Sequence, residues 1–168
     1  MKKYLTFIIV LFSISIFSQN ITLGELLSLR KKDVAEVDEY LTLKRWSFIE
    51  AEEPGDKLGN ITYAYGKNIY SDEALSFINY YYSDYSTTKR ISIQIHKASI
   101  LNSYVNQIKA WGGRLYDSYV ENGSITKIYR GSTMTYKVVT DTQSNGFGGT
   151  NTLHYFVIYT NDDYDRNN

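Results

Sequence analysis

Apolar and polar residues alternate along several short segments of the chain, a pattern typical of half-buried antiparallel strands. The clearest case is 90–96, where three isoleucines alternate with polar residues. The Asn122-Gly123 pair between two such segments is typical of a two-residue hairpin turn. On these patterns we expect eight strands, at 47–52, 60–65, 74–82, 90–96, 114–121, 124–129, 133–142 and 152–160.

Two short helices are expected before the first strand. Thr22 and Glu25 have the spacing of a capping box, which predicts a helix that ends at about Arg30. Asp33 and Glu36 repeat that spacing and begin a second helix. This second helix carries one apolar stripe, formed by Val34, Val37 and Leu41.

A third helix is expected in the middle of the chain. Its apolar residues recur at helical spacing and form the strongest stripe in the sequence: Leu101, Tyr104, Val105, Ile108 and Trp111. Gly112-Gly113 ends it. Four strand-like segments follow, as four also follow the second helix.

This order suggests an internal duplication. Trp46 and Trp111 lie 65 residues apart, and each closes a helical stretch. Residues 61–63 (ITY) align with residues 125–127 (ITK) at nearly the same offset. We interpret the chain as a single globular domain, residues 19–168, built from two pseudo-repeats at about 33–97 and 98–161. The alternative is a chance match, since sequence identity between the halves is low.

The expected fold class is α+β, with tandem helix-plus-four-strand repeats. Each helix has one apolar side to bury, so we expect one antiparallel sheet with helices packed on one face. Trp46 and Trp111 then belong to the core. In layout, though in no sequence motif, this arrangement resembles bacterial tandem-repeat inhibitor proteins, a resemblance that implies binding to another protein.

Residues 1–18 have the pattern of a secretory signal peptide. Lys2 and Lys3 precede an apolar run that is too short to span a bilayer comfortably. We therefore expect an exported protein, periplasmic or extracellular, with no membrane attachment after cleavage; a single membrane anchor is the alternative. The chain has no Cys, so neither a disulfide framework nor a lipidated cysteine is available.

Composition excludes some partners. The sequence has 18 basic and 18 acidic residues, and loss of Lys2 and Lys3 leaves the exported chain near −2. A nucleic-acid or anionic-membrane binder usually carries a basic stripe, so neither is an expected partner. Tyrosine is unusually abundant, with 17 residues against one Pro, and this composition favours sheet.

No motif indicates catalysis, and we expect no catalytic residue, metal or cofactor. His96 and His154 are the two histidines; no G-x-S-x-G nucleophile elbow accompanies them, and two His without Cys make a zinc site improbable. Residues 161–165 (NDDYD) lack the Gly and distal Glu of a calcium loop. We expect that segment to be a solvated, frayed terminus.

Aromatic residues supply the candidate binding site. Tyr80, Tyr81 and Tyr82 are consecutive, so their rings point to both faces of the sheet. If the helices cover one face, the other can present tyrosines to a partner. The Gly-rich loop 144–151 adds an aromatic side chain at its tip. The candidate binding residues are Tyr63, Tyr80, Tyr82, Tyr129 and Phe147.

Three functions fit these observations. The first is a small exported protein that binds another protein, for example an immunity or inhibitor protein in the periplasm. The second is a glycan or small-ligand binding module that uses the Tyr-rich face. The third is a hydrolase that uses His96 or His154. The sequence leaves the partner and the oligomeric state open.

Overall fold

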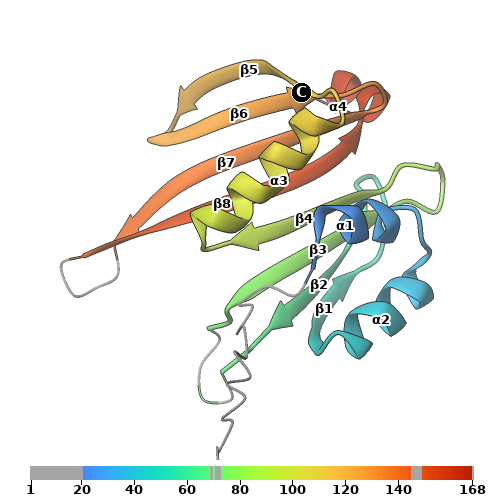
Figure 1. Ribbon diagram of the computed structural model, residues 1–168. Coiled ribbons are helices and arrows are strands. Elements are labelled where there is room, and N and C mark those ends of the chain that lie inside the picture. Colours follow the sequence, from blue (N-terminus) through green and yellow to red (C-terminus); the bar gives the residue numbers. More distant parts are fainter. Residues whose placement is uncertain (1–20, 69, 71–72, 145–148, 168) are drawn as a thin grey trace, which may run out of the picture.

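Two four-stranded meanders join side by side into one antiparallel sheet (Figure 1). This computed structural model describes residues 21–68, 70, 73–144 and 149–167. Within them, the eight strands are arranged in the order β1-β2-β3-β4-β8-β7-β6-β5. Their bounds are β1 Trp46–Glu52, β2 Gly59–Tyr65, β3 Ser76–Tyr82, β4 Arg90–Ile95, β5 Arg114–Glu121, β6 Ser124–Arg130, β7 Met134–Ser144 and β8 Thr150–Thr160.

The expected α+β fold with an antiparallel sheet is confirmed. Each of the eight strands overlaps a segment chosen from the alternation of apolar and polar residues. Asn122 and Gly123 both have positive φ, 50° and 81°, as the predicted hairpin turn requires. The helices are α1 Leu23–Leu29, α2 Val34–Leu43, α3 Ala98–Ala110 and α4 Asn161–Asn167.

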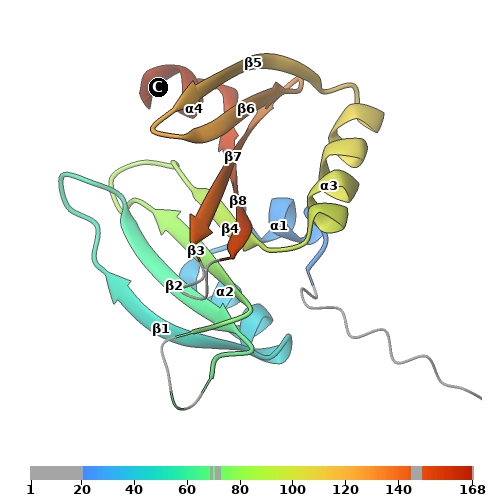
Figure 2. The same cartoon turned by 90° about the vertical axis from the view of Figure 1, so that its left-hand side faces the viewer.

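Three of these helices, α1 to α3, lie on one face of the sheet and enclose the core (Figures 1 and 2). Their buried stripes pack on the inward side chains of the central strands. The ring of Tyr104 in α3, for example, meets Phe156 of β8 edge to face, with 5.3 Å between ring centroids. Among the described residues, no helix has both the length and the apolar character needed to cross a membrane.

One carboxylate joins α1 to α2. Glu25 closes the expected capping box with Thr22, and its Oε1 also accepts hydrogen bonds from Tyr40 Oη at 2.6 Å and Lys44 Nζ at 2.7 Å. Partial burial alone would raise the pKa of Glu25, but these donors favour the charged form and lower its pKa to about 2. The two short helices are therefore held together by a group that stays ionised at neutral pH.

The fourth helix lies on the opposite face, so the expectation of helices on one face only is wrong for α4 (Figure 2). The expectation of a frayed terminus is wrong as well, because Asp163 of α4 is only 2% exposed. Asp163 bonds to Arg90 of β4, which alternates with the inward-facing Ile91. Acidic residues in the first turn and Arg166 in the last also suit the helix dipole.

The two tryptophans have different surroundings. Trp46 begins β1 and is 2% exposed, as expected for a core residue. Trp111 is 52% exposed, so its expected place in the core is wrong. The buried stripe of α3 ends at Ile108, and Trp111 caps the helix before Gly112 turns the chain with a φ of 84°. Its side chain is therefore only half covered, in a shallow pocket that Leu27 and Met134 also line.

Candidate binding groove

Two of the candidate tyrosines lie in the core rather than on an open face. Tyr63 is 1% exposed and Tyr80 is fully buried. Their hydroxyls reach polar groups of the helical layer: Tyr80 Oη donates to the carbonyl of Lys32 at 2.6 Å, and Tyr63 Oη donates to Asp38 at 3.1 Å. Each ring fills apolar space while its hydroxyl keeps a partner, so neither ring surface is available to a second molecule.

The other three candidates are scattered. Tyr129 is 7% exposed and belongs to the same core. Tyr82 is half-buried, and its ring stacks on Tyr80 with 6.1 Å between centroids. Phe147 lies outside the described residues. The structure therefore does not bring the five together as one surface.

Of the three consecutive tyrosines in β3, Tyr81 is the one that points to the face of the sheet opposite to α1, α2 and α3. Side chains alternate along β3, so Tyr81 points away from Tyr80 and Tyr82. It lies between Asn60 of β2 and Arg90 of β4 in the sheet. Three consecutive tyrosines give no polar and apolar alternation, so the sequence could not show which of them faces outward.

Beside Tyr81 lies a groove of about 720 Å³, here called the α4 groove. Its walls come from parts of the chain that are far apart in sequence: the β1–β2 loop, the β3–β4 hairpin and α4. The lining residues are Gly55, Asp56, Lys57, Leu58, Tyr81, Ser83, Tyr85, Ser86, Thr88, Arg90, Asp163, Arg166 and Asn167. Most of them are polar, and Tyr85 at the hairpin is 82% exposed.

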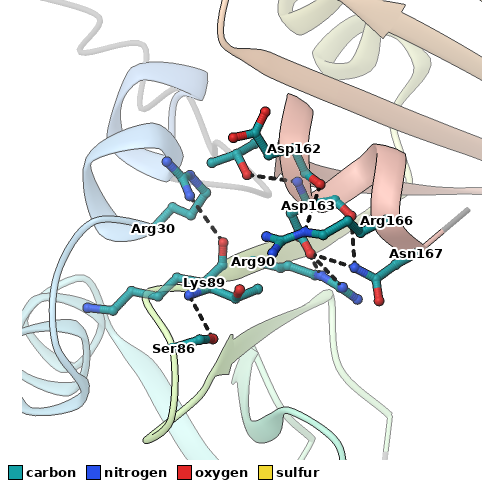
Figure 3. A network of polar contacts seen from close by, with 10 residues as sticks. Arg30, Ser86, Lys89, Arg90, Asp162, Asp163, Arg166 and Asn167 are labelled. Atoms are coloured by element: carbon teal, nitrogen blue, oxygen red, sulfur yellow. Dashed lines mark hydrogen bonds and ion pairs between the residues drawn. The ribbon is translucent and has the colours of Figure 1, made fainter.

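A partly buried ion pair, Arg90 with the buried Asp163, forms the base of the α4 groove (Figure 3). Arg90 donates from Nε to Asp163 Oδ2 at 2.7 Å and from Nη2 to Oδ1 at 2.8 Å, a bidentate arrangement. The hydrogen bonds to Asp163 raise the pKa of Arg90 despite its partial burial. The Arg90 guanidinium also lies over the ring of Tyr159, 5.2 Å from its centroid. This base is therefore rigid and electrically balanced.

Further hydrogen bonds position α4 at the groove wall. Within α4, Asn167 Nδ2 donates to the carbonyl of Asp163 at 2.8 Å and to its Oδ1 at 3.0 Å, which supports the carboxylate that Arg90 binds. At the other end of the helix, Asn161 accepts from Thr135 Oγ1 at 2.8 Å and donates to the carbonyl of Ser132 at 3.1 Å. With its first turn bonded to Thr135 and Asp163 bonded to Arg90, α4 is an ordered wall of the groove and carries the exposed Arg166.

The two histidines lie near each other but are bonded to neutral groups. The Nδ1 of buried His154 is 2.9 Å from Thr140 Oγ1, and the Nε2 of exposed His96 is 3.0 Å from Gln94 Nε2. Burial lowers the pKa of His154, and the nearby charge of His96 lowers it further. Among the described residues, no group of three or more His, Cys, Asp or Glu side chains is placed to hold a metal ion.

The lowered pKa of His154 predicts a loss of stability in mild acid. The unfolded chain takes up a proton near the ordinary pKa of 6.5, whereas the native site resists it. The free energy of unfolding should therefore be highest above about pH 6.5 and should fall as the pH drops below that value. We expect His154→Gln to flatten this dependence in urea titrations. Burial also lowers the pKa of His96, but this side chain is exposed, so His96→Gln should flatten the dependence less. Equal effects of the two variants would contradict the assignment to His154.

A second notable surface lies at the far edge of the sheet. Every residue of β5 is exposed, including Leu115 at 54% and Val120 at 72%. On the neighbouring β6, Ile125 is 46% exposed. The sequence carried a signal for this surface, because Leu115, Tyr116, Tyr119 and Val120 do not alternate with polar residues as a half-buried strand would.

No protein-family model, curated protein or solved structure matches this chain.

Proposed function

We propose that this chain is a small exported protein that binds another protein, in the manner of an immunity or inhibitor protein, and that the α4 groove is its binding site. The observation that carries the proposal is the groove itself, with a rigid ion pair at its base and tyrosines at its walls. Export rests on the signal-peptide pattern of residues 1–18.

The character of the groove favours a protein loop over a small molecule. Small-molecule sites are mostly apolar pockets that enclose most of the ligand surface. The α4 groove is open, and its apolar side chains are few: Leu58, Tyr81 and Tyr85. A polar rim around aromatic and arginine anchors is instead typical of protein interfaces.

Charge adds to this argument. Arg90 and Asp163 neutralise each other at the base, which leaves Lys57 and Arg166 to act on a bound partner against the single carboxylate of Asp56. A partner loop that carries a carboxylate and an apolar side chain would complement this rim, with the carboxylate toward Arg166.

A glycan is the second candidate, because Tyr81 and Tyr85 offer rings at the edge of a polar groove. Neither candidate requires chemistry from the two histidines, so we propose binding rather than catalysis. The two candidates differ in what the groove would capture from the exported fraction of the source cells.

We also propose that the two halves of the sheet arose by duplication. The strand order is β1-β2-β3-β4 followed by β8-β7-β6-β5. Each meander therefore joins the other through its last strand, β4 or β8, and has its first strand at an outer edge of the sheet. Each meander also begins with a bulged pair, between Phe48 and Glu50 in β1 and between Leu115 and Asp117 in β5. A bulge near the start of the first strand of each meander supports a common origin.

Site-specific photo-crosslinking tests the proposed site. A crosslinking residue at Tyr85 should capture a defined partner from the periplasmic fraction or culture fluid, whereas one at Tyr70 should not. Tyr70 is the matched control, because it is 91% exposed and lies in the β2–β3 connection, at the opposite end of the strands. Protease digestion of the adduct would identify a protein partner, and glycosidase digestion a glycan.

Affinity measurements complete the test. With the captured partner purified, Tyr85→Ala and Arg166→Ala should each weaken binding by about tenfold or more, as interface anchors do. Tyr70→Ala should bind like the unchanged protein. Equal capture at positions 70 and 85, or an unchanged affinity of both groove variants, would refute the α4 groove as the site.

A further inference from the structure

The edge strand β5 has a sequence that is complementary to itself. It reads Arg-Leu-Tyr-Asp-Ser-Tyr-Val-Glu. A bulge makes Tyr116 an extra residue, so Tyr116 and Asp117 together take one position and Ser118 lies at the centre. If a second β5 runs antiparallel beside it about this centre, Ser118 faces Ser118 of the second copy and three pairs of residues on either side meet counterparts of fitting chemistry. Arg114 faces Glu121, Leu115 faces Val120, and Tyr116 faces Tyr119.

The bulge in β5 makes this match hold in three dimensions. Leu115 and Val120 are five residues apart, so in a regular strand they would point to opposite faces. Their partners on β6 are Tyr129 and Ile125, which are four apart and share a face. The extra residue at Tyr116 therefore brings Leu115 and Val120 to the same face of the sheet.

The other two pairs share the opposite face. Arg114 and Glu121 lie beside Arg130 and Ser124, which are six residues apart on β6. The ring of Tyr116 lies under the guanidinium of Arg130 on that face, 5.3 Å from centroid to Cζ. Tyr119 lies beside Thr126, four residues from Arg130, so it points the same way.

The backbone and side chains of β5 are free for such a contact. In the sheet β5 neighbours only β6, and an edge strand turns half of its N–H and C=O groups outward. Arg130 is already paired with Asp165 at 2.6 Å, whereas the structure shows no such partner within the described chain for Arg114 or Glu121. Ser118 is the exception, because its N–H already donates to the Asp117 carboxylate at 2.7 Å.

The other edge of the sheet does not have these properties. β1 is covered by α2, buries Trp46, and carries Glu50 and Glu52, which would repel a second β1. β5 has neither a covering helix contact of this kind nor a strong net charge. We infer that two copies of this chain pair edge to edge through antiparallel β5 strands, about a two-fold axis at Ser118.

This pairing extends the sheet across two protomers and joins the exposed Leu115 and Val120 of both copies. It lies at the edge opposite to β1 and uses no residue that lines the α4 groove. A contact built mainly on one strand is small, and small interfaces give weak, concentration-dependent association. The dimer should therefore form at high protein concentration and separate on dilution.

Charge exchange between the two ends of β5 tests the inference by sedimentation velocity over a concentration series. Arg114→Glu places Glu against Glu121, and Glu121→Arg places Arg against Arg114. Each variant alone should dimerise about tenfold more weakly than the unchanged protein. An equimolar mixture of the two variants restores both opposite-charge pairs, so the mixture should dimerise again.

Glu50→Arg on β1 is the matched control and should leave the association unchanged. The inference is overturned if the unchanged protein stays monomeric at millimolar concentration. It is also overturned if the protein dimerises but the β5 variants do so equally well, or if the mixture stays as monomeric as its components. Circular dichroism of each variant confirms that it is folded, and none of these outcomes depends on a partner for the α4 groove.

Discussion

Replacing Trp46 with alanine should lower the free energy of unfolding by about 3–5 kcal/mol, the usual loss when a large buried aromatic is truncated. The indole is 2% exposed and packs against Tyr65, with 5.3 Å between ring centroids. Trp111→Ala should cost about 1 kcal/mol or less, because a half-exposed side chain leaves little cavity behind. Urea unfolding followed by circular dichroism measures both.

The same two variants also distinguish the positions seen in the structure, one tryptophan buried and one exposed, from the expectation that both lie in the core. Matching Trp46 with Trp111 led us to expect both in the core, which predicts equal losses of stability. Each variant retains one tryptophan, so its fluorescence reports on that residue alone. Emission typical of a buried indole from Trp46, and of a solvated indole from Trp111, would agree with the structure; equal losses would contradict it.

The second large effect is expected at the base of the α4 groove. Asp163→Asn keeps the shape of the side chain but removes the charge that balances Arg90. Loss of one partner from a buried ion pair costs about 3–5 kcal/mol, and the partial exposure of Arg90, 22% of its side chain, puts this variant near about 3 kcal/mol. Because the groove wall depends on this pair, binding of any groove ligand should weaken as well.

A neighbouring pair supplies the control. Arg130 and Asp165 form the same bidentate arrangement, at 2.6 and 2.7 Å, but the Asp165 side chain is 53% exposed. Water replaces the lost contacts there, so Asp165→Asn should barely move the urea midpoint. If the two variants lose the same stability, the ion pair at position 163 is not what holds α4 on the sheet.

Local sequence signals predicted most of the secondary structure. The alternation at 90–96 is clear because its isoleucines face the core and its polar residues face the other side. The capping boxes at Thr22 and Asp33 form as their spacing indicated. Such features depend on residues within a few positions of one another, and a single sequence contains all of them.

Features that depend on contacts between distant parts of the chain could not be predicted from these local signals. The helix α4 is acidic and short, and it is ordered because Asp163 finds Arg90, 73 residues earlier in the chain. The choice of Tyr80 and Tyr82 over Tyr81 failed for a related reason. Which face of β3 is covered depends on where α1 and α2 pack. Three consecutive tyrosines have no alternation of apolar and polar residues that could indicate that face. The α4 groove is assembled from three such distant segments.

The order of the strands also has a consequence for how the chain folds. Within each meander every strand pairs with a sequence neighbour, so these contacts close short loops quickly. The β4–β8 pair is different, since Ile91 must find Ile158 across most of the second half. Until β8 arrives, β4 is an uncovered edge bearing Ile91, Ile93 and Ile95. We therefore expect the pairing of β4 with β8 to be the slow step of folding, and the half-built sheet to be most prone to aggregation before it forms.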